Sequence, residues 1–108
     1  MFIMISDFIK GLNILAKHQE RGDVYGSHEM VYVGGIDLDS VSLEEVRELG
    51  ALGFIPGDGS VSISDLIFRK FDHDIWEAGL KTGGVQTLTQ EEWDWLKDVV
   101  SRGFCYYT

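Results

Sequence analysis

Two stretches of the chain, Val41–Phe54 and Leu88–Phe104, share one pattern of apolar and polar positions. In each, the second residue carries a hydroxyl and glutamate follows it three positions later, the spacing of a capping box that begins a helix. Apolar residues then recur at helical spacing, and a glycine able to adopt a left-handed conformation closes the pattern. These positions are Ser42, Leu43, Glu45, Val46, Leu49 and Gly53 in the first stretch, and Thr89, Glu92, Trp93, Leu96, Val100 and Gly103 in the second. A phenylalanine and a short extended run follow each glycine, so the pattern predicts two helices that each lead into a strand.

The first third of the sequence predicts one more helix and a hairpin. Apolar residues at helical spacing indicate a helix over about residues 7–18, with Ser6 as its N-cap. The segments 24–25 and 30–33 are typical of two strands, and the turn between them is predicted at Gly26-Ser27.

The segment between the two capped helices is harder to interpret. Composition predicts a turn at Pro56–Ser60. Val61 and Ile63 alternate like a strand, and helical spacing then favours a helix over about Asp65–Glu77. With an aromatic strand at Phe104–Tyr107, the elements predict an α+β fold in one domain, residues 1–108, with three to four helices packed on a small, mostly antiparallel sheet.

Composition favours a cytoplasmic protein. Cys105 is the single cysteine, so no internal disulfide can form and a reducing compartment is expected. The apolar opening segment is short and is interrupted by Asp7, which argues against a signal peptide. No apolar run approaches the roughly 20 residues that a membrane-spanning helix needs.

The net charge of −9 lies almost entirely after residue 36. Residues 37–108 hold 14 acidic and six basic side chains, a net of −8. Such a field repels phosphate groups, which argues against direct nucleic-acid binding, and it attracts a basic protein surface. The competing interpretation is that the acids serve solubility alone.

Two segments resemble metal sites superficially. Asp72-His73-Asp74 combines possible ligands, but neither a strand nor a helix would bring all three side chains together. The spacing of Asp37, Asp39 and Glu48 resembles a calcium-binding loop, but Val41 stands at a ligand position and Ser42 where such a loop needs glycine. We therefore expect no metal or other cofactor, although an enzyme using the Asp72–Asp74 region remains an alternative hypothesis.

No catalytic constellation is evident elsewhere. Cys105 lies in an aromatic strand, which predicts a buried, unreactive thiol. His28-Glu29 has no partner at the spacing of a nucleophilic triad, and Gly57-Asp58-Gly59 lacks the Lys-Ser/Thr of a phosphate-binding loop. The sequence predicts a protein that is not an enzyme.

The last predicted helix has a carboxylate stripe opposite its apolar face. Side chains one helical turn apart lie about 5–6 Å from each other. Successive phosphates of one nucleic-acid strand are separated by roughly 6–7 Å, so a basic groove that binds nucleic acid could accept such a stripe. Trp95, at the edge of the apolar arc, would supply an aromatic anchor. The predicted partner-binding residues are Glu44, Glu48, Glu91, Asp94, Trp95 and Asp98. The competing interpretation is an ordinary buried helix face with a solvated back.

Three segments, Gly11–His18, His28–Gly35 and Val41–Phe54, resemble small uncharacterised proteins of bacterial and bacteriophage genomes. The resemblance covers about the first half of the chain and includes no catalytic motif. It implies an origin in a mobile element, where small acidic proteins often inhibit host nucleic-acid machinery. The resulting hypothesis is an anti-CRISPR-like inhibitor that occupies a basic surface of a host defence complex. The alternative is a structural or self-associating module, a homodimer that pairs through Phe104–Tyr107 as an exposed edge strand.

Overall fold

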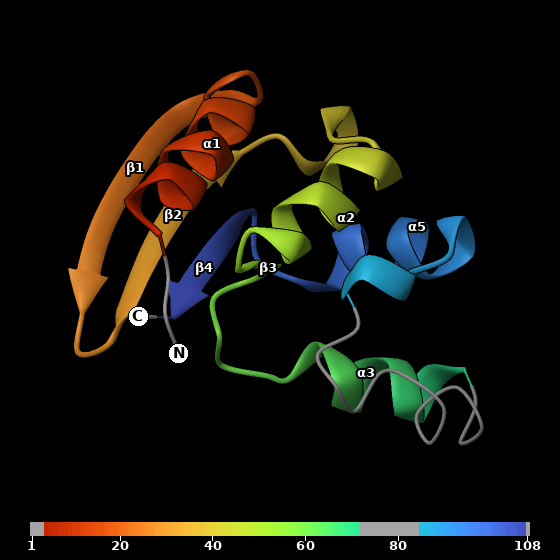
Figure 1. Ribbon diagram of the computed structural model, residues 1–108. Coiled ribbons are helices and arrows are strands. Elements are labelled where there is room, and N and C mark those ends of the chain that lie inside the picture. Colours follow the sequence, from red (N-terminus) through yellow and green to blue (C-terminus); the bar gives the residue numbers. More distant parts are fainter. Residues whose placement is uncertain (1–3, 72–84, 108) are drawn as a thin grey trace.

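The computed structural model, which describes residues 4–71 and 85–107, contains a four-stranded antiparallel sheet and helices packed against it (Figure 1). The strands lie in the order β1-β2-β4-β3. They are β1 (Gln19–Ser27), β2 (Met30–Ile36), β3 (Phe54–Pro56) and β4 (Gly103–Tyr107). The helices in the described residues are α1 (Ile5–Ala16), α2 (Leu43–Ala51), α3 (Ile63–Lys70) and α5 (Gln90–Val99), with 3-10 turns η1 (Leu38–Ser40) and η3 (Val85–Thr87). The predicted α+β fold is confirmed.

The two faces of the sheet differ because side chains alternate along each strand. Val31, Tyr106 and Phe54 are register partners on the inner face, where Phe8 of α1 stacks on the Phe54 ring at 5.8 Å. Tyr32, Cys105 and Ile55 are partners on the opposite, outer face. We call these the inner and outer faces below.

Both predicted capping boxes are present. Ser42 Oγ accepts from the Glu45 amide at 3.1 Å, and Glu45 Oε1 accepts from the Ser42 amide at 3.1 Å. Thr89 and Glu92 exchange the equivalent bonds at 3.2 and 2.8 Å. Gly53 has φ 101°, the left-handed conformation expected after the first capped helix.

The predicted role of Gly103 as a helix stop is wrong. Helix α5 ends at Val99, and Val100 is already extended, with φ −92° and ψ 160°. Gly103 instead opens β4 opposite Gly34 of β2. A Cβ at position 103 would overlap the Val33 carbonyl oxygen, so this glycine permits close approach of two strands.

The predicted hairpin turn is displaced by two residues. Gly26 and Ser27 belong to β1 and pair with Val31 and Met30, so the loop consists of His28 and Glu29. His28 has φ 55°, a conformation that histidine adopts more readily than most non-glycine residues. The paired strands are therefore longer than the segments 24–25 and 30–33 that the sequence pattern predicted.

Two helix starts also differ from the prediction. Helix α1 begins at Ile5, because the amides of Asp7 and Phe8 bond to the Met4 carbonyl, so the N-cap is Met4 and not Ser6. Val61 and Ile63 form no strand: helix α3 already starts at Ile63, whose side chain is buried. The rest of the predicted helix, with Asp72-His73-Asp74, lies outside the described residues.

The predicted exposed edge at Phe104–Tyr107 is wrong, because β4 lies between β2 and β3. Phe104, Cys105 and Tyr106 are all buried. The edges of the sheet are the nine-residue β1, almost entirely exposed, and the three-residue β3. Within the described chain, no helix combines the length and apolar character that crossing a bilayer requires.

Candidate protein-binding surface

The five predicted carboxylates lie on two helices that are tied together. Trp93 Nε1 of α5 donates to the Val41 carbonyl just before α2, at 3.1 Å, and Arg47 Nε of α2 donates to the Leu88 carbonyl just before α5, at 3.0 Å. These bonds place α2 and α5 side by side (Figure 1). All five carboxylates are exposed: Glu44, Glu48, Glu91, Asp94 and Asp98. We call this set the carboxylate surface.

One member of the carboxylate surface is partly neutralised. Asp94 Oδ1 lies 3.3 Å from Lys97 Nζ and accepts from Gln90 Nε2 at 2.9 Å. The hydrogen bond from Gln90 holds the pKa of Asp94 below its ordinary value. The hydrogen bond from Lys97 and the charge of Lys97 lower this pKa further. Among the described residues, the other four carboxylates form no ion pair. Their charge is therefore available to a partner.

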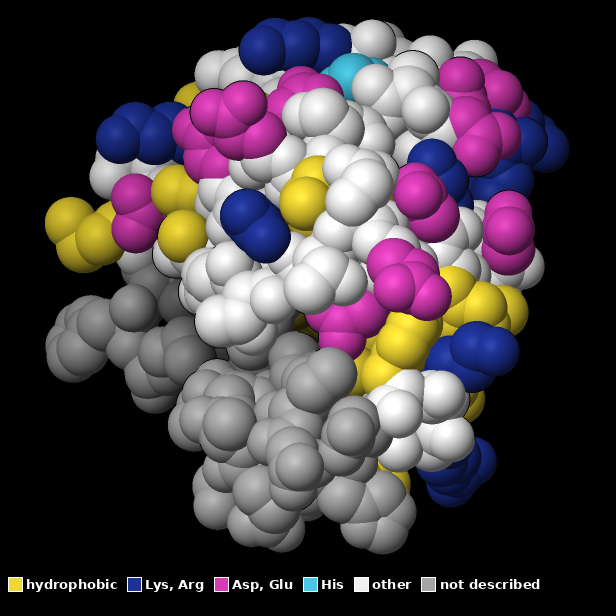
Figure 2. All heavy atoms as spheres, turned by 90° about the vertical axis from the view of Figure 1, so that its right-hand side faces the viewer, with side chains coloured by type: hydrophobic (Ala, Val, Ile, Leu, Met, Phe, Trp, Pro, Cys, Tyr) yellow, Lys and Arg dark blue, Asp and Glu magenta, His cyan; other side chains and the backbone are white. Residues whose placement is uncertain are grey.

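Figure 2 faces the side of the molecule on which α5 lies. Asp and Glu side chains are spread over this face, with Lys and Arg side chains between them. The surface is thus acidic but of mixed sign. Exposed charges separated by more than about 8 Å are largely screened at physiological ionic strength, so a partner must approach closely to use them.

The two tryptophans of α5 have different surroundings. Trp93 is 1% exposed and belongs to the core. Trp95 is half-buried and meets the Phe71 ring edge to face, with centroids 5.7 Å apart and an interplanar angle of 88°. Only Trp95 keeps exposed ring area, as a contact residue requires, but part of that ring is already used in packing.

A second feature, which the sequence predicted only as a turn, lies at Asp58–Ser60. Asp58 Oδ1 accepts hydrogen bonds from the Ser60 amide, at 2.9 Å, and from the Ser60 hydroxyl. These bonds hold the pKa of Asp58 below its ordinary value. The Gly57 amide donates to the Gly103 carbonyl at 2.8 Å, which ties the turn to the start of β4. The turn therefore carries a fixed negative charge at the edge of the sheet.

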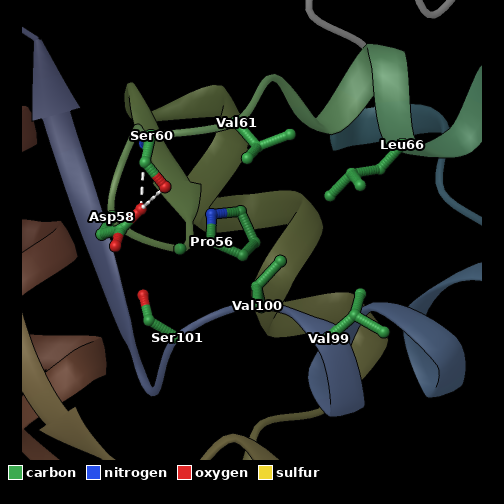
Figure 3. Close-up of a pocket in the computed structure, with 9 residues that line it drawn as sticks. Pro56, Asp58, Ser60, Val61, Leu66, Val99, Val100 and Ser101 are labelled. Carbon is green, nitrogen blue, oxygen red and sulfur yellow. Dashed lines mark hydrogen bonds between the residues drawn. The ribbon is translucent and has the colours of Figure 1, made fainter.

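A hollow of about 190 Å³ lies beside this turn (Figure 3). The turn contributes Asp58 and Ser60, while α3 and the end of α5 contribute aliphatic side chains. Val61 and Val99 are 52% and 50% exposed, high values for valine. The remaining lining residues are Pro56, Gly57, Leu66, Val100 and Ser101.

A second hollow, of about 260 Å³, is lined by the same two turn residues, Asp58 and Ser60, and we call it the tyrosine hollow. Tyr25 and Tyr32 of the outer face stack with centroids 5.1 Å apart and planes inclined by 21°. The Tyr32 hydroxyl lies 3.2 Å from Ser101 Oγ, which fixes that ring. The hollow is lined by Tyr25, Ser27, Met30, Tyr32, Asp58 and Ser60.

Two of the groups considered for catalysis, Cys105 and His28, lie in the described part of the chain. Cys105 is fully buried, and burial, followed by the charge of Asp58, raises the pKa of its thiol. The predicted buried thiol is confirmed. His28 lies in the β1–β2 loop. Within residues 4–71 and 85–107, no three His, Cys, Asp or Glu side chains group as metal ligands.

Neither hollow was evident from the sequence. The tyrosine hollow joins residues of β1 and β2 to a turn about 30 residues later, and the hollow shown in Figure 3 adds the end of α5. The one local signal was Gly57-Asp58-Gly59, correctly interpreted as a turn. Comparisons with protein-family models, with curated proteins and with solved structures find no match to this chain.

Proposed function

We propose that this protein is a small, non-enzymatic binding protein whose carboxylate surface occupies a basic, nucleic-acid-binding surface of a partner in the cytoplasm. The inferred partner is a host defence complex, and the activity is inhibition of the anti-CRISPR type. The observation that carries the proposal is the exposure, on two joined helices, of five carboxylates, four of which have no ion-pair partner among the described residues.

Physical arguments support this choice of partner. The net charge of −9 repels phosphates and steers the protein toward cationic surfaces. Glu91, Asp94 and Asp98 recur at helical spacing, and carboxylates one turn apart lie about 5–6 Å from each other. A groove lined by Lys and Arg to bind a phosphate backbone would accept that row, and the half-buried Trp95 would add an apolar contact at its edge.

Competition with nucleic acid tests the proposal directly. Guide-loaded CRISPR nucleases are incubated with the protein, and binding of labelled target DNA is followed by mobility shift at low and high salt. The double variant Glu91→Lys and Asp98→Lys should abolish inhibition, because both carboxylates are exposed and neither has an ion-pair partner within residues 4–71 and 85–107. The wild-type effect should weaken as salt rises.

A matched variant separates this surface from net charge. Asp39→Lys with Asp65→Lys makes the same charge change on η1 and α3, at exposed positions outside the carboxylate surface. It should keep most of the inhibition. Equal loss in both double variants would show that only total charge matters, and inhibition unaffected by Glu91→Lys and Asp98→Lys would remove this surface from the proposal.

Self-association is a second candidate, favoured by the exposed edge strand β1. Beyond the irregular pairing between Gln19 and Asp23, this strand offers a regular segment from Asp23 to Ser27. Pairing with its twin about Tyr25 would continue the ladder of stacked tyrosines. Sedimentation velocity decides the matter: a dimer should appear with rising concentration and be lost in Tyr25→Lys. A monomer at every concentration argues against this candidate.

A further inference from the structure

The tyrosine hollow has the composition of a site for a planar cation. Its wall is two stacked rings, of which Tyr25 is 57% exposed and Tyr32 is held by Ser101. Met30 extends this wall along the outer face of the sheet. The negative π-face of an aromatic ring attracts a cation placed over it. An exposed, fixed pair of rings therefore offers a preformed surface for such a group.

Asp58 is the one ionised side chain among the six that line the hollow. Both hydrogen bonds from Ser60 go to Oδ1, and among the described residues no other residue donates to Oδ2. Among the described residues that line the hollow, none is Lys or Arg, so none of them neutralises the carboxylate. The charge is thus held in place and one oxygen remains free to accept a bond from a ligand.

We propose that the tyrosine hollow binds the side chain of an arginine presented by the basic partner. A guanidinium group can stack flat on Tyr25 or Tyr32 while its N–H groups donate to Asp58 Oδ2. The ammonium of lysine is a compact, strongly hydrated charge and would satisfy the carboxylate without covering the rings. This inference rests on the proposed function, because the basic partner supplies the arginine.

Other ligand classes fit the same residues less well. An anion would meet the Asp58 carboxylate, and a nucleic-acid strand would bring phosphates toward a protein of net charge −9. A metal ion would find a single carboxylate with serine hydroxyls and no histidine or second acid among the lining residues. Stacked rings beside one uncompensated carboxylate are best matched by a group that is both flat and cationic.

The test uses the full chain and a defined probe. N-acetyl-arginine amide is titrated into the protein while NMR follows the tyrosine ring resonances, with N-acetyl-citrulline amide as an uncharged probe of the same shape. Addition of the arginine probe should shift the Tyr25 and Tyr32 ring resonances, and the shifts should reach saturation. Citrulline should bind about three- to tenfold more weakly, the range expected when a cation over a ring becomes neutral.

Variants assign the contacts. Asp58→Asn leaves a side-chain oxygen to accept from Ser60, so the turn is retained while the charge is lost, and Tyr25→Leu removes the exposed ring. Each should weaken arginine binding about three- to tenfold. Asp65→Asn, an exposed acid on α3 outside the hollow, should leave it unchanged. Amide spectra establish that each variant is folded.

The outcomes separate this inference from the proposed function. Absence of ring shifts with arginine, or equal binding of arginine and citrulline, overturns the inference even where Glu91→Lys with Asp98→Lys abolishes inhibition. Arginine binding that depends on Asp58 and Tyr25 supports it. If that binding is found while Glu91→Lys with Asp98→Lys leaves inhibition intact, the proposed role of the carboxylate surface is rejected and the arginine site in the tyrosine hollow is retained.

Discussion

His18 Nε2 lies 2.8 Å from Glu45 Oε2, so the second residue after α1 is tied to the first turn of α2. The other ring nitrogen, Nδ1, lies 2.8 Å from Ser40 Oγ. Because the Ser40 hydroxyl donates to the Asp37 carbonyl, its oxygen accepts from Nδ1, and the carboxylate accepts from Nε2. The two contacts join the end of α1, η1 and α2 through one side chain.

This tie makes stability depend on acid pH. Burial favours the neutral form of Glu45, but hydrogen bonds from His18 and Ser42, with the His18 charge, hold its pKa below the ordinary value of 4.5. A carboxyl whose pKa is lowered on folding stabilises the protein above its unfolded pKa, and this contribution is lost as the pH falls through the folded pKa. Glu45→Gln keeps a capping-box acceptor but loses the charge. At neutral pH the free energy of unfolding of Glu45→Gln should be about 1 kcal/mol lower than that of the wild type.

The measurement is urea unfolding from neutral pH down to about pH 3. The wild type should lose stability more steeply than Glu45→Gln as the pH falls below about 5, because the variant has already lost this contribution. Glu48→Gln, on the same helix but exposed, is the matched control and should follow the wild type. An identical pH dependence in Glu45→Gln and wild type would contradict the assignment.

Gly103 and Gly34 face each other across β2 and β4 but should respond oppositely to alanine. A Cβ at Gly103 would overlap the Val33 carbonyl oxygen, which is held in the sheet, whereas a Cβ at Gly34 would meet nothing within 4 Å. Gly103→Ala should lower the free energy of unfolding by about 1–3 kcal/mol. Gly34→Ala should be neutral or gain up to about 1 kcal/mol, because glycine in a strand costs more conformational entropy. Chemical denaturation of the pair checks this, and equal losses would contradict it.

At Gly11, helix propensity favours alanine whereas packing favours glycine. In a helix interior alanine is favoured over glycine by about 1 kcal/mol. However, a Cβ at Gly11 would overlap the Phe54 ring, which is fully buried and packed against Phe8 and Tyr106. Since overpacking costs about 1–3 kcal/mol, Gly11→Ala should be neutral to destabilising by about 2 kcal/mol. Asn13→Ala, exposed on the same helix, should gain up to about 0.5 kcal/mol, and thermal unfolding of both variants tests the comparison.

The parts of the fold that depend on neighbours in sequence could be predicted. The capping boxes of Ser42 and Thr89 and the left-handed Gly53 follow from residues within one or two helical turns, and all are present. Gly103 has the same local pattern as Gly53 but a different role, because the Val33 carbonyl 70 positions earlier sets it. The residues near Gly103 in the sequence do not predict that contact.

The candidate site shows the same division. Exposure of the five acids of the carboxylate surface follows from helical periodicity, which places them opposite the apolar face. The tyrosine hollow requires knowing that Tyr25 pairs with Tyr32 and that the turn at Asp58 reaches the outer face. Strand order decides both. Because the sequence does not determine the strand order, Phe104–Tyr107 was interpreted as an edge strand, although it lies inside the sheet.

Trp93 and Trp95, two residues apart on α5, separate stability from binding. Trp93 Nε1 donates to the Val41 carbonyl in the core, so Trp93→Phe leaves that acceptor without its donor and creates a void. The free energy of unfolding should fall by about 2–3 kcal/mol. Trp95→Phe keeps an aromatic ring against Phe71 and should lose less than about 1 kcal/mol.

Function should follow the opposite order. At a temperature where both variants are folded, Trp95→Ala should weaken inhibition of the partner, because it removes the exposed aromatic edge beside the carboxylate surface. Trp93→Phe should leave inhibition intact, because its ring lies in the core. Circular dichroism in urea gives the stabilities, and mobility-shift competition gives the inhibition. Full inhibition by Trp95→Ala would mean that the carboxylates act without this anchor, since Trp95 is the only tryptophan on α5 that a partner can reach.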